Sequence, residues 1–172
     1  MSLPTVPLSA ALGNPTNVQP RAVRTGLLVP TLIVLLGMLH ALLYALVIPP
    51  WGLLDEHQHF HYVQLIAQEQ RTPVMWRDHL SKEVVDSVYA ARRYVTLGAA
   101  AMPSREELDQ SDLFFDMYSY EGLHPPLYYA VLAPFYPLGP SDVLSKLFIL
   151  RVAGVLLSGI TLVLVWASAR WL

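Results

Sequence analysis

The sequence predicts an all-α integral membrane protein with three transmembrane helices and a long extracytoplasmic loop of short amphipathic helices between the first two. Composition is the first reason: 54% of the 172 residues are hydrophobic and only 14% are charged, whereas soluble domains carry about 25% charged residues. The second reason is that two apolar runs, 26–48 and 144–170, are long enough to cross a bilayer. The third is that acids and histidines concentrate in the segment between these runs.

The chain begins with a segment of small and polar residues, 1–25, that contains prolines and ends near Arg21 and Arg24. This composition predicts a disordered tail, and its basic end predicts a cytoplasmic location. Residues 26–48 then form an apolar run just over twenty residues long, which is the length of a membrane-spanning helix. The proline pair at 49–50 ends this helix, because proline has no backbone N–H to donate.

The loop 49–124 holds twelve of the thirteen acidic residues, six of the eleven basic ones and five of the six histidines. Helical spacing predicts three short helices in it, and such amphipathic helices lie in the membrane interface. The first predicted helix has Asp55, His59, Tyr62, Val63 and Ile66 on one side, and the second helix has the stripe Leu80, Val84, Val88, Ala91 and Val95. At the start of the third helix, Ser104 and Glu107 have the spacing of a capping box.

The apolar segment 125–139 is predicted to be a short second transmembrane helix, although fifteen helical residues reach only about 22 Å. Its prolines kink it, and packing inside a helix bundle tolerates such kinks because neighbouring helices satisfy the freed carbonyls. Residues 144–170 form the third helix. In this helix Gly154, Ser158 and Gly159 form a patch of small residues suited to close helix contact.

The basic residues beside the apolar runs predict the topology. Arg21 and Arg24 precede the first helix, and Lys146 and Arg151 lie at the start of the last. The positive-inside rule places both groups on the cytoplasmic side, with Arg151 extending to the cytoplasmic surface and the acidic loop 49–124 outside. The chain is therefore predicted to be a multi-pass protein of the plasma (inner) membrane.

Composition also excludes some classes of function. The chain has no cysteine, which rules out disulfides and thiolate-bound metals. It has no run of basic residues, so nucleic acid is not an expected partner. The lipid bilayer is the expected partner instead.

Two carboxylates and three histidines occur in the twelve residues "WGLLDEHQHFHY", directly after the first apolar run. Asp55 and Glu56 are expected at the outer membrane surface, where a carboxylate can act as a general base. His59 lies one helical turn after Asp55 and is placed to orient it by a hydrogen bond. The alternative interpretation is a solvated helix start, because the helix dipole stabilises acids in the first turn.

The same segment offers ligands for a metal ion. Asp55, Glu56 and His59 form a candidate site for a divalent cation, Mg²⁺ or Mn²⁺, held together with a phosphate. His57 and His61 have the spacing of a zinc-binding pair, which needs a third ligand that the fold supplies. The alternative is that the histidines only pack and cap at the interface.

Three blocks of the sequence together resemble a known superfamily. The first block has the pattern Pro50, Asp55, Glu56, His59, Tyr62 and Val63, followed by "TPV" at 72–74. The second block is "YEGLHPPLYYAVLAPFYPLG" at 120–139, and the third is "LRVAGVLLSGITLVLVW" at 150–166. In this order the blocks resemble the GT-C membrane glycosyltransferases that use polyprenyl-phosphate sugars, such as the protein O-mannosyltransferases and aminoarabinose transferases of glycosyltransferase family 39.

The resemblance implies that a sugar moves from a polyprenyl phosphate to an acceptor on the extracytoplasmic face. Asp55, with Glu56 beside it, matches the first-loop acid of the family and would be the base or a metal-facing carboxylate. His124 would donate to the lipid phosphate. The residues assigned to the phosphate are His124, Glu121, Arg92 and Arg93, and the supporting residues are His59 and Tyr62.

Enzymes of this superfamily have many more spans than the three predicted here. The chain is therefore interpreted as the N-terminal part of such an enzyme, and its 172 residues alone are not expected to be active. Its partners would be a polyprenyl-phosphate sugar and the remainder of the enzyme or a membrane subunit. Two other interpretations stay open: a non-catalytic small membrane protein or accessory subunit that binds a partner through the loop, and a metal-binding or transport component that uses His57, His59 and His61.

Overall fold

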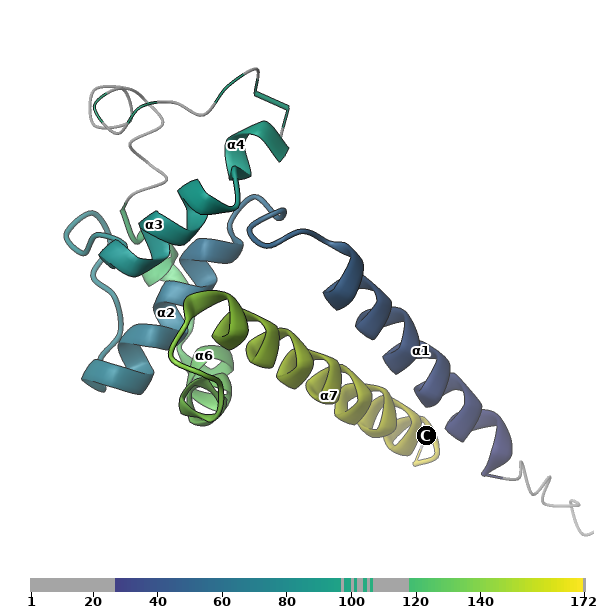
Figure 1. Ribbon diagram of the computed structural model, residues 1–172. Helices are drawn as coiled ribbons and strands as arrows, with labels where there is room; N and C mark the ends of the chain where they lie inside the picture. The colour runs from purple at the N-terminus through teal and green to yellow at the C-terminus, as the bar shows by residue number, and fades with distance from the viewer. Residues whose placement is uncertain are drawn as a thin grey trace, which may run out of the picture.

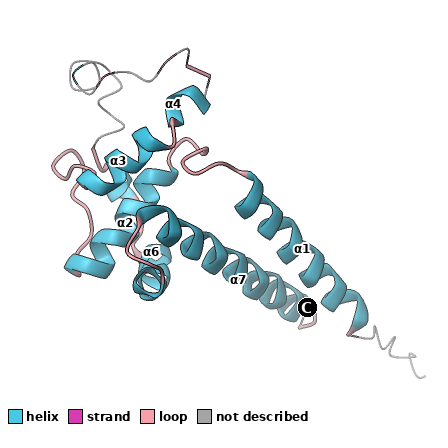
Figure 2. Ribbon diagram, in the orientation of Figure 1, coloured by secondary structure: helices cyan, strands magenta, loops and turns pink. Residues whose placement is uncertain are grey.

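The computed structural model describes residues 27–96 and 118–171, together with Gly98, Ala99, Ala101, Ser104 and Glu106. The predicted tail 1–25 and the helix predicted to follow the capping box, with Glu107, lie outside the described residues. Every regular element of the described part is helical (Figure 2), which confirms the all-α prediction. The elements are α1 (Leu28–Val47), α2 (Glu56–Glu69), α3 (Lys82–Ala90), α4 (Arg93–Thr96), η3 (Tyr120–Leu123), α6 (Leu127–Leu132), η4 (Ala133–Leu138) and α7 (Val143–Ala169).

The two long apolar helices, α1 and α7, pack side by side and run in opposite directions (Figure 1). Leu162 lies against Gly37, and Gly159 lies against Met38. A Cβ added to Gly159 would come within 2.6 Å of the Met38 sulfur. The close helix contact predicted for the small-residue patch therefore occurs within the chain, at Gly159.

Length and apolar composition allow both α1 and α7 to cross a membrane. They correspond to the predicted spans 26–48 and 144–170. No residue of α1 is buried, and Leu36, for example, is 68% exposed. An apolar surface of this kind is unfavourable in water, at about 25 cal/mol per Å², and is compatible with lipid.

The segment predicted as a second transmembrane helix, 125–139, is shorter than a membrane span. It forms α6 and η4, whose six α-helical and six 3₁₀ residues extend about 21 Å, against a hydrocarbon core of about 30 Å. The change from α-helix to 3₁₀-helix comes at the residue before Pro134. Both pieces pack on α2, and Tyr129 and Tyr136 are buried. The structure therefore does not confirm a third span.

This arrangement corrects the predicted topology. Because α6 and η4 fold back on α2, α7 begins at the loop end of α1 and ends beside the start of α1 (Figure 1). Lys146 and Arg151 thus lie at the loop end of the hairpin. The prediction that they share a side with the start of the first helix is wrong. Arg151 donates to the carbonyl oxygen of Ile48 at 2.7 Å.

The core of the loop forms around α2 and α3. The stripe predicted for α3 is present, since Leu80, Val84 and Val88 are buried. The amphipathic interfacial helix predicted for α2 is instead covered by neighbours over most of its surface. Its buried residues are His57, Gln58, Phe60, His61, Tyr62, Val63, Gln64 and Leu65.

Candidate functional site

A group of polar side chains meets at the loop end of the α1–α7 hairpin. Asp55 is the N-cap residue of α2, and His59 lies one turn later. Glu121 lies in η3, and His124 follows directly after it. Tyr129 comes from α6, 70 residues after His59. The structure therefore brings the first-loop acid together with the Glu121 and His124 of the second sequence block.

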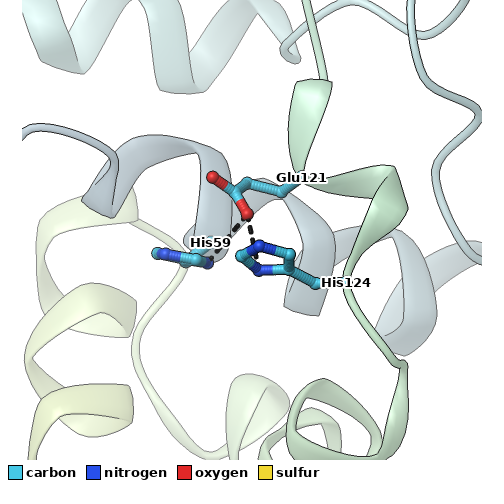
Figure 3. Close-up of side chains that lie close together, drawn as sticks. All are labelled: His59, Glu121 and His124. Carbon is cyan, nitrogen blue, oxygen red and sulfur yellow. Dashed lines mark ion pairs between the residues drawn. The ribbon is translucent and has the colours of Figure 1, made fainter.

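Glu121 lies between the two histidines (Figure 3). Its Oε2 is 2.8 Å from His124 Nδ1 and 3.8 Å from His59 Nδ1. On the far side of its ring, His59 Nε2 lies 3.4 Å from Asp55 Oδ2. The Glu121 side chain is 4% exposed, whereas those of His59 and His124 are 34% and 56% exposed. A buried carboxylate is thus flanked by two imidazoles that a ligand can reach.

Tyr129 lies inside this group. Its hydroxyl is 2.8 Å from His59 Nδ1 and 3.2 Å from His124 Nδ1. Its ring stacks on Tyr62 with centroids 3.8 Å apart, and Tyr62 donates to the carbonyl oxygen of His124 at 3.1 Å. Burial raises the pKa of both tyrosines. Both hydroxyls therefore keep their protons at neutral pH and can donate hydrogen bonds.

The turn 118–124 that carries Glu121 and His124 is held against a neighbouring segment of the loop. Ser119 N donates to the carbonyl oxygen of Asp78 at 2.8 Å. A Cβ added to Gly122 would come within 2.8 Å of the Pro73 carbonyl oxygen. Glycine at 122 is therefore required for the close approach that places the two polar residues on either side of it.

The replacement Asp78→Asn is expected to lower the free energy of unfolding by about 1–2 kcal/mol at pH 7. The Asp78 carboxylate accepts from Arg71 Nη1 at 2.7 Å and from Val74 N at 2.6 Å, and the hydrogen bond from Arg71 lowers its pKa. A lowered pKa stabilises the fold above the unfolded value of 3.8, and this stabilisation is lost as the pH falls through the folded value. Thermal unfolding followed by circular dichroism at neutral and acidic pH measures the difference.

Asp86→Asn is the matched control for this prediction. Asp86 pairs with Lys82 on the exposed side of α3, and an exposed pair of this kind contributes about 0.5 kcal/mol or less. An Asp78→Asn protein that unfolds like the control at pH 7, or whose deficit persists in strong acid, would contradict the prediction.

Glu56 forms an ion pair with Arg151 of α7. Arg151 Nε and Nη2 donate to the two carboxylate oxygens at 2.6 and 2.8 Å, the two-point geometry that favours guanidinium–carboxylate pairs. The same guanidinium donates to the carbonyl oxygens of Ala45 and Ile48, which the end of α1 leaves without partners inside the helix, and to that of Pro49. Glu56, predicted as a second catalytic carboxylate, is therefore held in a contact that joins α1, α2 and α7.

The turn between α1 and α2 depends on the same carboxylate. Trp51 has a left-handed backbone, with φ of 60°, which is rare for a bulky residue. Its side chain is fully buried against Phe60, and its backbone N–H donates to Glu56 Oε2 at 3.0 Å. Arg93 of α4 donates to the carbonyl oxygen of Leu54. These contacts fix the turn that positions the start of α2.

Two adjoining pockets open at the site. One, of about 390 Å³, is a largely apolar cleft between α1, α2 and α7. The other, of about 800 Å³, contains the side chains of Asp55, His59 and His124. An apolar cleft therefore borders a second pocket, which is also largely apolar but presents the polar side chains of Asp55, His59 and His124. The residues that line both pockets are Leu53, Glu56, His59 and Tyr128.

Four candidate residues lie away from these pockets. Arg92 is exposed and Arg93 is buried at the turn after α1, and neither lines either of these two pockets. His57 and His61 are 1% and 2% exposed, on the side of α2 opposite His59. Burial lowers the pKa of His61 to about 4, so its imidazole is neutral at pH 7. His57, His59 and His61 therefore do not form one site.

Arg151 and Tyr129 belong to the site but were not predicted to do so. The sequence feature that could have indicated Arg151 is its position in an apolar run, because a charged residue there needs a partner. Tyr129 stands in an aromatic segment beside Tyr128, and nothing in the sequence distinguishes the two. Tyr62 was predicted as a supporting residue, and it contacts Tyr129 and His124.

The chain has also been compared with known proteins. No family model, no curated protein and no solved structure matches it. The chemistry and geometry of the residues themselves are therefore the basis for assigning a function.

Proposed function

We propose that this site belongs to a membrane glycosyltransferase that moves a sugar from a polyprenyl phosphate to an acceptor on the extracytoplasmic face. The meeting of Asp55, His59, Glu121 and His124 beside an apolar cleft carries the proposal. A polyprenyl chain is apolar and suits the apolar cleft, and its anionic phosphate can accept a hydrogen bond from the His124 imidazole in the second pocket. The resemblance of the three sequence blocks to the GT-C superfamily supports the same function.

In the proposed reaction an acceptor hydroxyl gives its proton to the Asp55 carboxylate, and its oxygen attacks the anomeric carbon of the sugar. The bond from that carbon to the phosphate oxygen breaks, and polyprenyl phosphate leaves with the bonding electrons. The Asp55 side chain is 46% exposed and lines the second pocket, so an acceptor can reach it. His124 donates to the departing phosphate and stabilises its charge.

The same proposal places the hairpin of α1 and α7 across the plasma (inner) membrane, with the N-terminus in the cytoplasm and the loop outside. Arg170 follows α7 directly, at the end of the hairpin where α1 starts. This basic residue and the sequence position of Arg21 and Arg24 before α1 agree with the positive-inside rule for a cytoplasmic N-terminus. The acidic loop then faces outward, where the lipid-linked donor is presented.

Asp55→Asn is expected to lower sugar transfer by at least about 100-fold while membrane insertion stays unchanged, because the amide cannot accept the proton. Membranes from cells that express the complete enzyme, supplied with radiolabelled polyprenyl-phosphate sugars, provide the measurement. Glu69→Gln is the control, since Glu69 is an exposed acid at the other end of α2. Normal transfer by Asp55→Asn would contradict the proposal. It would favour a non-catalytic membrane subunit, in which Asp55 can be changed without effect.

A further inference from the structure

We propose that His59, Glu121 and His124 form a zinc site with one coordination position open to the second pocket. The three side chains offer two imidazole nitrogens and a carboxylate oxygen, and these atoms all lie within 4.8 Å of one another. Two histidines and one carboxylate are a ligand set of catalytic zinc, which keeps a further position for water or a substrate oxygen. Both histidines line the pocket, so that position faces the space a ligand would enter.

The distances suit a zinc ion after small side-chain rotations. Ligand atoms about 2.1 Å from a tetrahedral zinc lie about 3.4 Å from one another. Glu121 Oε2 is 2.8 Å from the nitrogen of His124 and 3.8 Å from that of His59. These two separations differ from the required value by about half an ångström, and the nitrogens of the two histidines lie within 4.8 Å of one another. Figure 3 shows the carboxylate directed at both rings.

Asp55 holds His59 in the form that binds a metal. The Asp55 carboxylate faces His59 Nε2 at 3.4 Å, and this position favours the tautomer with the ring proton on Nε2. The lone pair of His59 Nδ1 then points toward Glu121 and the Tyr129 hydroxyl. Metal-binding histidines commonly donate their other N–H to a carboxylate in this way. Asp55 is therefore a positioning residue for the zinc, and its second oxygen is left for an acceptor.

The predicted metal set of Asp55, Glu56 and His59 changes accordingly. Glu56 is held by Arg151, and Asp55 lies behind His59 rather than beside it. Two imidazoles favour zinc over Mg²⁺, which prefers oxygen ligands. Zinc bound to Nδ1 of His124 leaves Nε2–H of the same ring to donate to a phosphate, so the site is compatible with the proposed transfer and does not depend on it.

The first test uses the whole chain in detergent micelles, freed of metal with a chelator and then titrated with Zn²⁺ alone. One zinc per chain is expected by calorimetry and by elemental analysis after gel filtration. X-ray absorption at the zinc edge should show nitrogen and oxygen ligands at about 2.0–2.1 Å, with scattering from two imidazole rings. No bound zinc, or a zinc with fewer than two imidazoles, would overturn the proposal.

The second test compares variants of the same chain. His124→Ala and Glu121→Gln should lower zinc affinity more than about 100-fold, and Asp55→Asn about 10- to 100-fold with one zinc still bound. His79→Gln is the matched control, because His79 is an exposed histidine of the same loop outside both pockets. Unchanged affinity in His124→Ala, or an equal loss in His79→Gln, would contradict the zinc site. Because no sugar donor is present, these results are independent of whether transfer occurs.

Discussion

Arg151→Met is expected to lower the free energy of unfolding by about 3–5 kcal/mol, because it leaves one member of a buried ion pair alone. The side chains of Arg151 and Glu56 are 13% and 11% exposed, so water cannot fully replace the lost partner. The same change removes the donors that cover the carbonyl oxygens of Ala45, Ile48 and Pro49. Methionine keeps similar length and removes only the charge and the hydrogen bonds.

Three further variants isolate the cause of this loss. Arg151→Lys should recover only part of it, because an ammonium group cannot form the two-point contact. The double variant Glu56→Gln with Arg151→Met should unfold later than Arg151→Met alone, because no unpaired charge remains. Arg170→Met is the control, since Arg170 lies over the Trp166 ring at the opposite end of α7. Unfolding in mixed detergent micelles measures all four proteins, and equal stability of Arg151→Met and Arg170→Met would contradict the expected role.

Gly122→Ala is expected to abolish zinc binding and to lower sugar transfer by about 100-fold or more. A Cβ at this position would lie 2.8 Å from the Pro73 carbonyl oxygen and 3.0 Å from Met75 N. Both are backbone atoms, so the strain is relieved only by displacing the turn 118–124. This displacement separates Glu121 and His124 from His59, at a cost in stability of about 1–3 kcal/mol.

Gly154→Ala is the matched control for Gly122→Ala. A Cβ at Gly154 meets nothing within 4 Å, and alanine is the better helix former by about 1 kcal/mol. This variant should therefore bind zinc like the unchanged chain and be at least as stable. Zinc titration and thermal unfolding of both variants give the comparison. Full zinc affinity in Gly122→Ala would show that the turn does not position the ligands.

The long helices were predictable because the signal lies in consecutive residues. A run of more than twenty apolar residues specifies a helix of membrane length, and α1 and α7 occupy the two such runs. The stripe in α3 was predictable for a similar reason, since residues three and four positions apart share a side of a helix. Leu80, Val84 and Val88 show this spacing and are buried.

The spacing rule was less successful for α2 and for the segment 125–139. Neighbours from several directions cover α2, so polar residues such as Gln58 and Gln64 are buried together with apolar ones. An apolar segment that ends in a 3₁₀-helix has the composition of a membrane span and the length of a core helix. Only the packing of this segment on α2 and α7 shows that it is a core helix and not a membrane span. The same packing reverses the expected direction of α7.

The sequence alone identified Asp55, His59 and the motif with Glu121 and His124 as candidates, because residue types and local spacing can be read from the chain. Their assembly depended on tertiary contacts that no local pattern contains. Arg151 reaches Glu56 across 95 positions, and Tyr129 reaches His59 across 70. Which carboxylate stays open to a ligand and which is held in an ion pair follows from these contacts, since Asp55 and Glu56 are adjacent in sequence and differ only in the neighbours that the fold brings to them.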